Sequence, residues 1–388
     1  MAIYFYSLIA TIVLSVINDV LYKNGKANLK DGWQAFLISL PLAIVAGLRT
    51  LDIGTDVQVY GYGAFKAASS STSFISYVKA MDIRYSLEYG YAILNFLVSR
   101  VTNNINIFLF ILSMVTIIPF VLGSLLFRKQ FSVPLWIQMG VFWGINYGST
   151  LNIMRQSVAM SILYLAVAFL LSKREHNILL FFILLFCAFE FHRTAAVGIV
   201  FFLIFEYIEV IIVRTKFSVR LPILAVIIPS IIIIGASIVK ILINTGFLAK
   251  YQQYMGTDNW LNQASQGWDR IFLLTIGPLL VVILLSVYLY LSTNKENKRL
   301  VIFLLIVLII DILTQFSSRS GKLFSRLGMY FVLFESISLP LGLNVLFNKR
   351  TQIIGHLILM VYIIIIFYTV TKSGSGEIYP YQWIFNFK

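Results

Sequence analysis

The chain has 388 residues, of which 59% are hydrophobic and only 12% are charged. Soluble domains carry about 25% charged residues, so this composition excludes an ordinary soluble protein and favours a single polytopic membrane domain over residues 1–388. The net charge of +14 does not indicate nucleic-acid binding, because about half of the basic residues lie in clusters between apolar runs. The single cysteine, Cys187, excludes an internal disulfide and a cysteine-based metal site.

Apolar runs of the length needed to cross a bilayer as helices follow one another along the chain. They predict an all-α, polytopic helical bundle of about twelve transmembrane helices on this length criterion. The expected helices cover residues 3–22, 33–48, 105–127, 133–148, 152–171, 177–191, 194–213, 221–243, 271–292, 299–316, 326–346 and 352–370. The first run begins at Ala2 with no basic segment before it, so we expect a retained helix and not a signal peptide.

Compact groups of lysine and arginine separate many of these runs and predict the orientation of the chain. They are Lys23/Lys26/Lys30, Arg128/Lys129, Lys173/Arg174, Arg214/Lys216/Arg220, Lys295/Lys298/Arg299 and Lys349/Arg350. With all of them facing the cytoplasm, both termini lie outside, and residues 49–104 and 244–270 form long extracytoplasmic segments.

Each external segment carries its own sequence signal. Glu88 to Val101 (EYGYAILNFLVSRV) has apolar residues at helical spacing and predicts an amphipathic or re-entrant helix. Residues 247–269 are rich in Gln, Asn, Tyr and Trp. That composition suits a carbohydrate-binding surface or an interfacial aromatic belt, and the sequence does not choose between them.

A second set of charged residues lies at the external ends of the apolar runs, where the positive-inside rule disfavours basic side chains. Snorkelling explains a single interfacial arginine, but the set as a whole predicts an anionic substrate such as a phosphate. The polar residues of this face are Arg49, Asp52, Asp56, Arg84, Glu88, Arg155, His192, Arg193, Arg270, Arg319, Lys322 and Arg326.

Local contexts suggest what these side chains do. In Gly47 to Tyr60 (GLRTLDIGTDVQVY), glycines permit close approach to a ligand, and Asp56 serves either as a structural clamp or as a base. In Asn152 to Ala159 (NIMRQSVA), we expect Asn152, Arg155 and Gln156 on one helical face, with Arg155 near a helix N-terminus that attracts phosphate.

The last two contexts are EFHRTA (190–195) and SSRSGKLFSR (317–326). His192 is either a general base for a hydroxyl or a helix-capping histidine. Arg319, Lys322 and Arg326 form the densest external basic group and suit a pyrophosphate. The sequence lacks a Walker loop, an HExxH motif and a Rossmann fingerprint, which argues against nucleotide substrates and a metal centre.

Several motifs, taken in their order along the chain, resemble the EpsG/Wzy-like family of bacterial polysaccharide polymerases. They are GLRTLDIGTD (47–56), SLEYGYAILNFLVSRV (86–101), NIMRQSVAMSI (152–162), FEFHRTAAV (189–197), SRLGMYF (325–331), SLPLG (338–342) and IYPYQW (378–383). The resemblance implies a GT-C-like membrane fold in the bacterial plasma membrane. It also implies transfer of a growing glycan from undecaprenyl diphosphate to the non-reducing end of another lipid-linked oligosaccharide, on the outer face. No cofactor is implied. The implied partners are the lipid-linked oligosaccharide and membrane lipid, and a chain-length regulator is left open.

For such a reaction we assign leaving-group stabilisation to Arg155, Arg319 and Arg326. His192 is the first choice of base and Asp56 the second. The further substrate contacts are Arg49, Glu88, Arg193, Arg270 and Lys322. Three alternatives are an outer-face glycan ligase, a flippase or transporter for lipid-linked oligosaccharides, and an acyltransferase.

Overall fold

The computed structural model describes residues 1–24, 30–84, 88–172, 176–207, 268–291, 295–317, 322–374 and 377–385. They form two compact units, which we call unit 1 (Met1–Ala195 with Met360–Lys388) and unit 2 (Ala196–Leu359). The helix predicted at residues 221–243 lies outside the described residues, as does most of the predicted external segment 244–270. The single membrane domain expected from the sequence stays a prediction.

Unit 1 is built from helices that follow the predicted apolar runs, together with three helices inside the predicted external segment 49–104. Its helices are α1 (Ala2–Lys23), α2 (Asp31–Gly47), α3 (Tyr62–Ser70), α4 (Phe74–Arg84), α5 (Tyr89–Ser99), α6 (Ile105–Phe131), α7 (Leu135–Val141), α8 (Gly148–Asn152), α9 (Met154–Leu170) and α10 (Asn177–Phe191). A π-helical segment precedes α3 (Val57–Gly61), another joins α7 to α8 (Phe142–Tyr147), and a 3₁₀ turn follows α10 (Arg193–Val197). The second half of α17 (Gln352–Lys372) packs on α1, where the rings of Tyr4 and Phe367 lie 5.6 Å apart.

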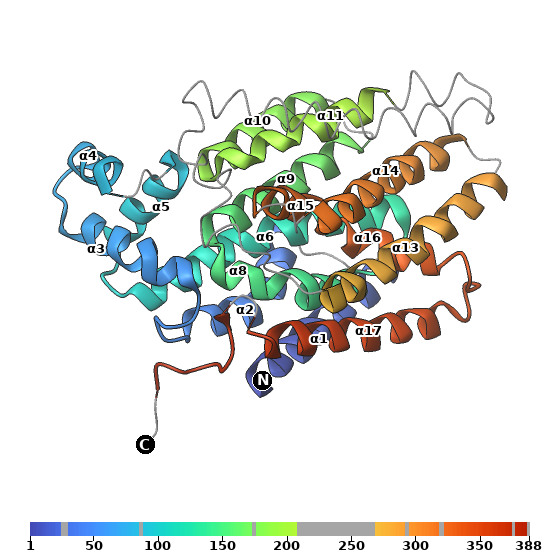
Figure 1. The fold of residues 1–388 in the computed structure, drawn as a ribbon, viewed down its shortest axis with the longest axis horizontal. Coiled ribbons are helices and arrows are strands. Elements are labelled where there is room, and N and C mark those ends of the chain that lie inside the picture. The colour runs from blue at the N-terminus through green and yellow to red at the C-terminus, as the bar shows by residue number, and fades with distance from the viewer. Residues whose placement is uncertain are drawn as a thin grey trace. The chain divides into compact units, whose positions relative to one another are not determined.

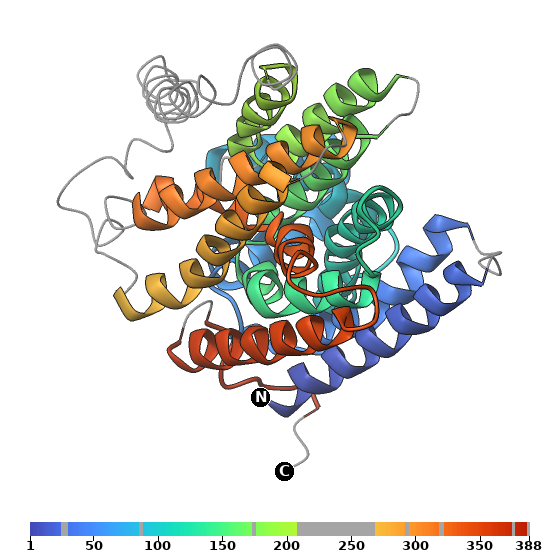
Figure 2. The same cartoon turned by 90° about the vertical axis from the view of Figure 1, so that its right-hand side faces the viewer.

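The helices of unit 1 separate into a bundle and a smaller group. α2 packs against α1 and α6, and α9 packs against α6 and α10; Figure 2 shows α1 and α2 as an antiparallel pair. α3, α4 and α5 contact one another and lie together at one end of the unit (Figure 1). The predicted helix at Glu88 to Val101 is present as α5, which has 11 residues. It rises only about 16 Å, about half of the hydrocarbon thickness of a bilayer.

Unit 2 contains α11 (Gly198–Tyr207), α13 (Trp268–Leu291), α14 (Lys295–Ser317), α15 (Lys322–Val332), α16 (Glu335–Leu343) and the first part of α17. The single span predicted at 326–346 is a pair of helices, α15 and α16, bent by 51°. Gly342 lets α16 approach α13, because an added Cβ would lie 2.6 Å from Val281. Phe201 of α11 packs against Phe331 and Phe334 with ring centroids 4.8 and 5.0 Å apart.

Five helices in the described residues are long and apolar enough to cross a membrane, namely α1, α6, and parts or all of α13, α14 and α17. The bent pair α15–α16 adds a sixth if it counts as one span. α2, α5, α9 and α10 are shorter apolar helices. The chain is therefore an all-α, multi-pass membrane protein, whereas the number of about twelve spans stays a prediction.

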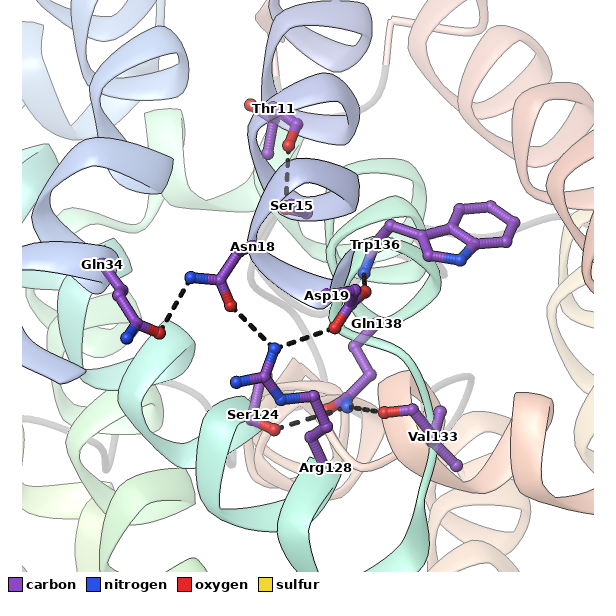
Figure 3. Close-up of polar contacts among 10 residues, drawn as sticks. All are labelled: Thr11, Ser15, Asn18, Asp19, Gln34, Ser124, Arg128, Val133, Trp136 and Gln138. Atoms are coloured by element: carbon purple, nitrogen blue, oxygen red, sulfur yellow. Dashed lines mark hydrogen bonds and ion pairs between the residues drawn. The ribbon is translucent and has the colours of Figure 1, made fainter. Parts of the chain in front are cut away.

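A buried ion pair joins four helices at one end of the unit 1 bundle (Figure 3). The Nη1 of Arg128 on α6 donates to the side chains of Asn18 and Asp19 on α1, at 2.7 and 2.8 Å. Asn18 donates to Gln34 of α2 at 2.8 Å, and the backbone N–H of Trp136 on α7 donates to Asp19 at 3.1 Å. Arg128, predicted only as an orienting charge, is thus also the centre of a polar cluster that ties α1, α2, α6 and α7 together.

Candidate functional site

The loop that follows α2, residues 48–56, is seated on the junction between α8 and α9. Gly54 has φ +91°, a left-handed conformation that glycine adopts without strain. A Cβ added to Gly54 would collide with the carbonyl oxygen of Leu151. Glycine at this position therefore allows the loop to lie directly against the end of α8.

Arg49 points into the protein from this loop and is only 2% exposed. Its Nη1 donates to the Leu151 carbonyl at 2.6 Å, and its own carbonyl accepts from the side-chain amide of Asn106 at 2.8 Å. Burial lowers the pKa of the Arg49 guanidinium to about 10. This value is still above neutral pH, so the group stays charged. Arg49 is therefore a buried cation with a backbone partner.

The C-terminal tail returns to this loop and covers it. Residues 48–50 and 382–384 pair through an isolated antiparallel bridge between Arg49 and Trp383, with backbone hydrogen bonds of 3.0 Å on either side. The hydroxyl of Tyr381 donates to a backbone carbonyl of α2 at 2.8 Å. The tail thus holds the loop and the end of α2 through these hydrogen bonds.

A break in the helix separates α8 from α9. α8 ends at Asn152, Ile153 has φ −87° and ψ 64°, and α9 begins at Met154. The sequence prediction that Asn152, Arg155 and Gln156 share one helical face is therefore wrong, because the backbone leaves the α conformation between the first of them and the other two. The break places Arg155 in the first turn of α9.

Arg155 is the centre of a charged network drawn from three segments of unit 1. Its Nη1 lies 2.5 Å from the Oε2 of Glu88, the residue that precedes α5. The guanidinium stacks on the ring of Tyr60, 4.3 Å from the centroid. The Tyr60 hydroxyl in turn donates to the carboxylate of Asp56. Asp56, Tyr60, Arg155 and Glu88 are therefore one connected group.

Exposure differs among these side chains in a way that bears on their chemistry. The Glu88 side chain is 1% exposed and that of Arg155 is 16% exposed, while Asp56 is half-buried. Burial raises the pKa of Tyr60 well above its usual value, so the hydroxyl stays protonated and remains a donor. Glu88 and Tyr60 are buried, and Arg155 and Asp56 are the more exposed members of the group.

The end of α10 lies against the start of α5, close in the chain to Glu88. A Cβ added to Gly90 would lie 2.7 Å from the carbonyl oxygen of Glu190. His192 caps α10 with an extended backbone, is 4% exposed, and its Nδ1 lies 2.6 Å from the Thr194 hydroxyl. His192 therefore lies at the C-cap of α10, which agrees with the capping alternative from the sequence. Its role as a general base stays a prediction.

The EpsG family model matches residues 32–383 of the chain. The chain belongs to the EpsG family. No curated protein and no solved structure matches it. The matched range includes the loop after α2, the α8–α9 break, the end of α10 and the tail up to Trp383. Membership supports a polysaccharide-polymerase type of role.

The other residues predicted for the site of this EpsG-family protein are described only by their own surroundings. Arg193 stacks on the ring of Phe189, 4.7 Å from its centroid. Arg326 lies half-buried on α15 of unit 2. Arg319 lies outside the described residues, and the structure describes the backbone but not the side chains of Lys322 and Arg270. Their convergence on one site stays a prediction.

Two aromatic residues of this network were not predicted from the sequence. Tyr60 lies four residues after Asp56, a helical spacing that places both side chains on one face and could have identified it. Tyr91, whose ring centroid lies 6.0 Å from the Arg155 guanidinium, is three residues after Glu88. Aromatic rings beside a predicted phosphate-binding arginine are the signal that was available.

Proposed function

We propose that this EpsG-family protein is a polysaccharide polymerase of the bacterial plasma membrane. It transfers a growing glycan from undecaprenyl diphosphate to the non-reducing end of another lipid-linked oligosaccharide on the outer face, without a metal ion. The observation that carries the proposal is the network of Asp56, Tyr60, Arg155 and Glu88, which brings a partly exposed cation and a partly exposed carboxylate into one connected group.

The reaction requires both charges. An acceptor hydroxyl oxygen forms a bond to the anomeric carbon of the donor, and the bond from that carbon to the diphosphate oxygen breaks. The diphosphate leaves with additional negative charge, and the hydroxyl proton passes to a base. A preorganised cation aimed at the leaving oxygen stabilises such a transition state by about 3–4 kcal/mol. Arg155 has this role in our proposal, with Arg193, Arg270, Arg319, Lys322 and Arg326 as further diphosphate contacts.

The geometry favours Asp56 over His192 as the base. Asp56 belongs to the same hydrogen-bonded group as Arg155, so base and leaving-group cation have a fixed spacing. The imidazole of His192 is 4% exposed and its Nδ1 is engaged with Thr194. We therefore propose Asp56 as the base and reverse the order expected from the sequence.

The direct test supplies the purified protein with a defined undecaprenyl-diphosphate oligosaccharide and no nucleotide. A ladder of products that grows by one repeat unit supports the polymerase. A single addition to a different acceptor supports the ligase instead, and the absence of any glycan transfer contradicts both.

Variants of Arg155 test the role given to its charge. Arg155→Ala should lower kcat by about 100- to 1,000-fold, the loss expected for removing one preorganised donor to a developing anion. Arg155→Lys keeps the positive charge but loses the planar guanidinium fork, so its kcat should lie between those of the wild type and Arg155→Ala. Arg350→Ala removes an exposed arginine elsewhere in the chain and is the matched control. Wild-type polymer formation by Arg155→Ala would remove this residue from the site.

A further inference from the structure

Arg49 was expected to contact substrate, yet its surroundings indicate a structural role. The guanidinium is 2% exposed, so a lipid-linked glycan cannot reach it without displacing the protein around it. The side chain contacts the α8–α9 junction through Leu151 and Met154, while the backbone of Arg49 pairs with the C-terminal tail. Its Nη1 donates a hydrogen bond of 2.6 Å to the carbonyl of Leu151.

The carbonyl that Arg49 binds is one that the α8–α9 break leaves without its usual helical donor. In an uninterrupted α-helix the carbonyl of Leu151 would accept a hydrogen bond from the backbone N–H of Arg155, four residues later. The turn at Ile153 ends α8 and starts α9 anew, so this carbonyl needs another donor. The Nη1 of Arg49 supplies it with a charge-assisted bond.

We propose that Arg49 is a positioning residue that keeps the α8–α9 break open, so that the first turn of α9 presents Arg155 to Glu88 and Tyr60. The proposal rests on the function proposed above for Arg155. Without the guanidinium, the Leu151 carbonyl would recover the Arg155 N–H, α8 and α9 would join, and the direction of the Arg155 side chain would change. Gly54 supports the same arrangement, since its missing Cβ leaves room for that carbonyl.

The kinetic test compares Arg49→Ala, Arg49→Lys and Gly54→Ala with wild type, using the lipid-linked oligosaccharide as substrate. A catalytic group misplaced by about 1 Å costs about a hundredfold in rate, so Arg49→Ala should lower kcat by about that factor with little change in KM. Arg49→Lys, which retains a cationic donor, should recover most of the rate. Gly54→Ala should resemble Arg49→Ala, because it disturbs the same carbonyl without removing a charge.

Coupling to Arg155 separates positioning from direct binding. In an Arg155→Lys background, which keeps measurable activity, Arg49→Ala should cost much less than it does in wild type. A raised KM at unchanged kcat, or a full and independent loss in that background, would show that Arg49 binds substrate and would overturn the proposal.

A second measurement does not depend on the reaction. Cys187 is exposed, so it is first replaced by serine. Arg155→Cys in that background is then labelled with a maleimide in the purified full-length protein, with Arg49 present and with Arg49→Ala. We expect labelling rates that differ by about tenfold or more; equal rates would refute a role for Arg49 in the break. If the polymerase assay fails for wild type, this labelling result still decides the role of Arg49.

Discussion

Tyr60 connects the acid and the cation of the site, and its two contacts can be removed one at a time. Tyr60→Phe loses the hydroxyl bonded to Asp56 but keeps the ring under the Arg155 guanidinium. Hydrogen bonds to charged groups contribute about 1.5–3 kcal/mol, so kcat should fall by about tenfold to a hundredfold. Tyr60→Leu also removes the ring, a cation–π contact of about 0.5–2 kcal/mol, and should be slower still. Steady-state kinetics on both variants checks the order.

An equal loss in the two variants would mean that the ring contributes nothing beyond the hydroxyl. A wild-type rate in Tyr60→Phe would separate Asp56 from the network and return the role of base to His192. Tyr62→Phe changes an exposed tyrosine two residues away and is the control for the chemical change itself.

At single positions the sequence singled out charged residues but did not predict how they pair, and their role on a substrate stays a prediction. Asp56, Glu88 and Arg155 were identified because charge on the external ends of apolar runs needs a reason. Their pairing was not predictable, since it depends on how α5 and the turn before α3 pack against α9. Arg49 was assigned to substrate because its contacts are with segments distant in the sequence, the α8–α9 junction through its side chain and the tail through its backbone.

Two ion pairs on consecutive residues of α6 provide a comparison of burial at the level of helix packing. Arg128 and Asp19 have side chains that are 5% and 9% exposed, while Lys129 and Asp31 are 38% and 39% exposed. Removing one partner of a buried pair leaves an uncompensated charge and costs about 3–5 kcal/mol. Arg128→Ala should therefore lower the free energy of unfolding by that amount, measured as loss of thermal stability in detergent.

Lys129→Ala is the matched control, because an exposed pair contributes only about 0–1 kcal/mol. The double variant Arg128→Met with Asp19→Leu should recover most of the lost stability, since it removes both charges and keeps the volume. Equal stability losses for Arg128→Ala and Lys129→Ala would show that the polar cluster around Arg128 (Figure 3) does not stabilise the packing of α1, α2, α6 and α7.

The helices themselves were predictable where hydrophobicity alone sets them. The run at 177–191 coincides with α10, and the runs at 3–22 and 105–127 correspond to α1 and α6. The sequence predicted separate helices at 133–148 and 152–171, and therefore an interruption near residues 149–151. It did not place the break at Ile153, because the donor that satisfies the Leu151 carbonyl comes from Arg49, 102 residues away in the sequence. The bend between α15 and α16 was not predicted, because no proline or glycine lies between Val332 and Glu335 to mark it in the sequence.

On the scale of the whole molecule, the contacts of unit 1 make the predicted sidedness testable. The hydroxyl of Tyr4, near the start of α1, donates to the carbonyl of Ile378 in the tail at 2.7 Å. Asp19, near the other end of α1, is bound to Arg128. A helix of 22 residues rises about 33 Å, enough to cross the hydrocarbon core. With α1 crossing the membrane, we expect the N-terminus, the tail and the site loop at one face and the Arg128 cluster at the other.

The positive-inside rule predicts that the face carrying the site is extracytoplasmic. Single cysteines in a Cys187→Ser background test this in intact cells with a membrane-impermeant maleimide, at the exposed positions Asp52, Tyr379 and Ser132. Asp52→Cys and Tyr379→Cys should be labelled from outside, and Ser132→Cys only after the cells are opened. The reverse pattern would place Arg155 and Asp56 at the cytoplasmic face, where a glycan exported on its lipid carrier does not reach them, and the proposed polymerase would then have no substrate at its site.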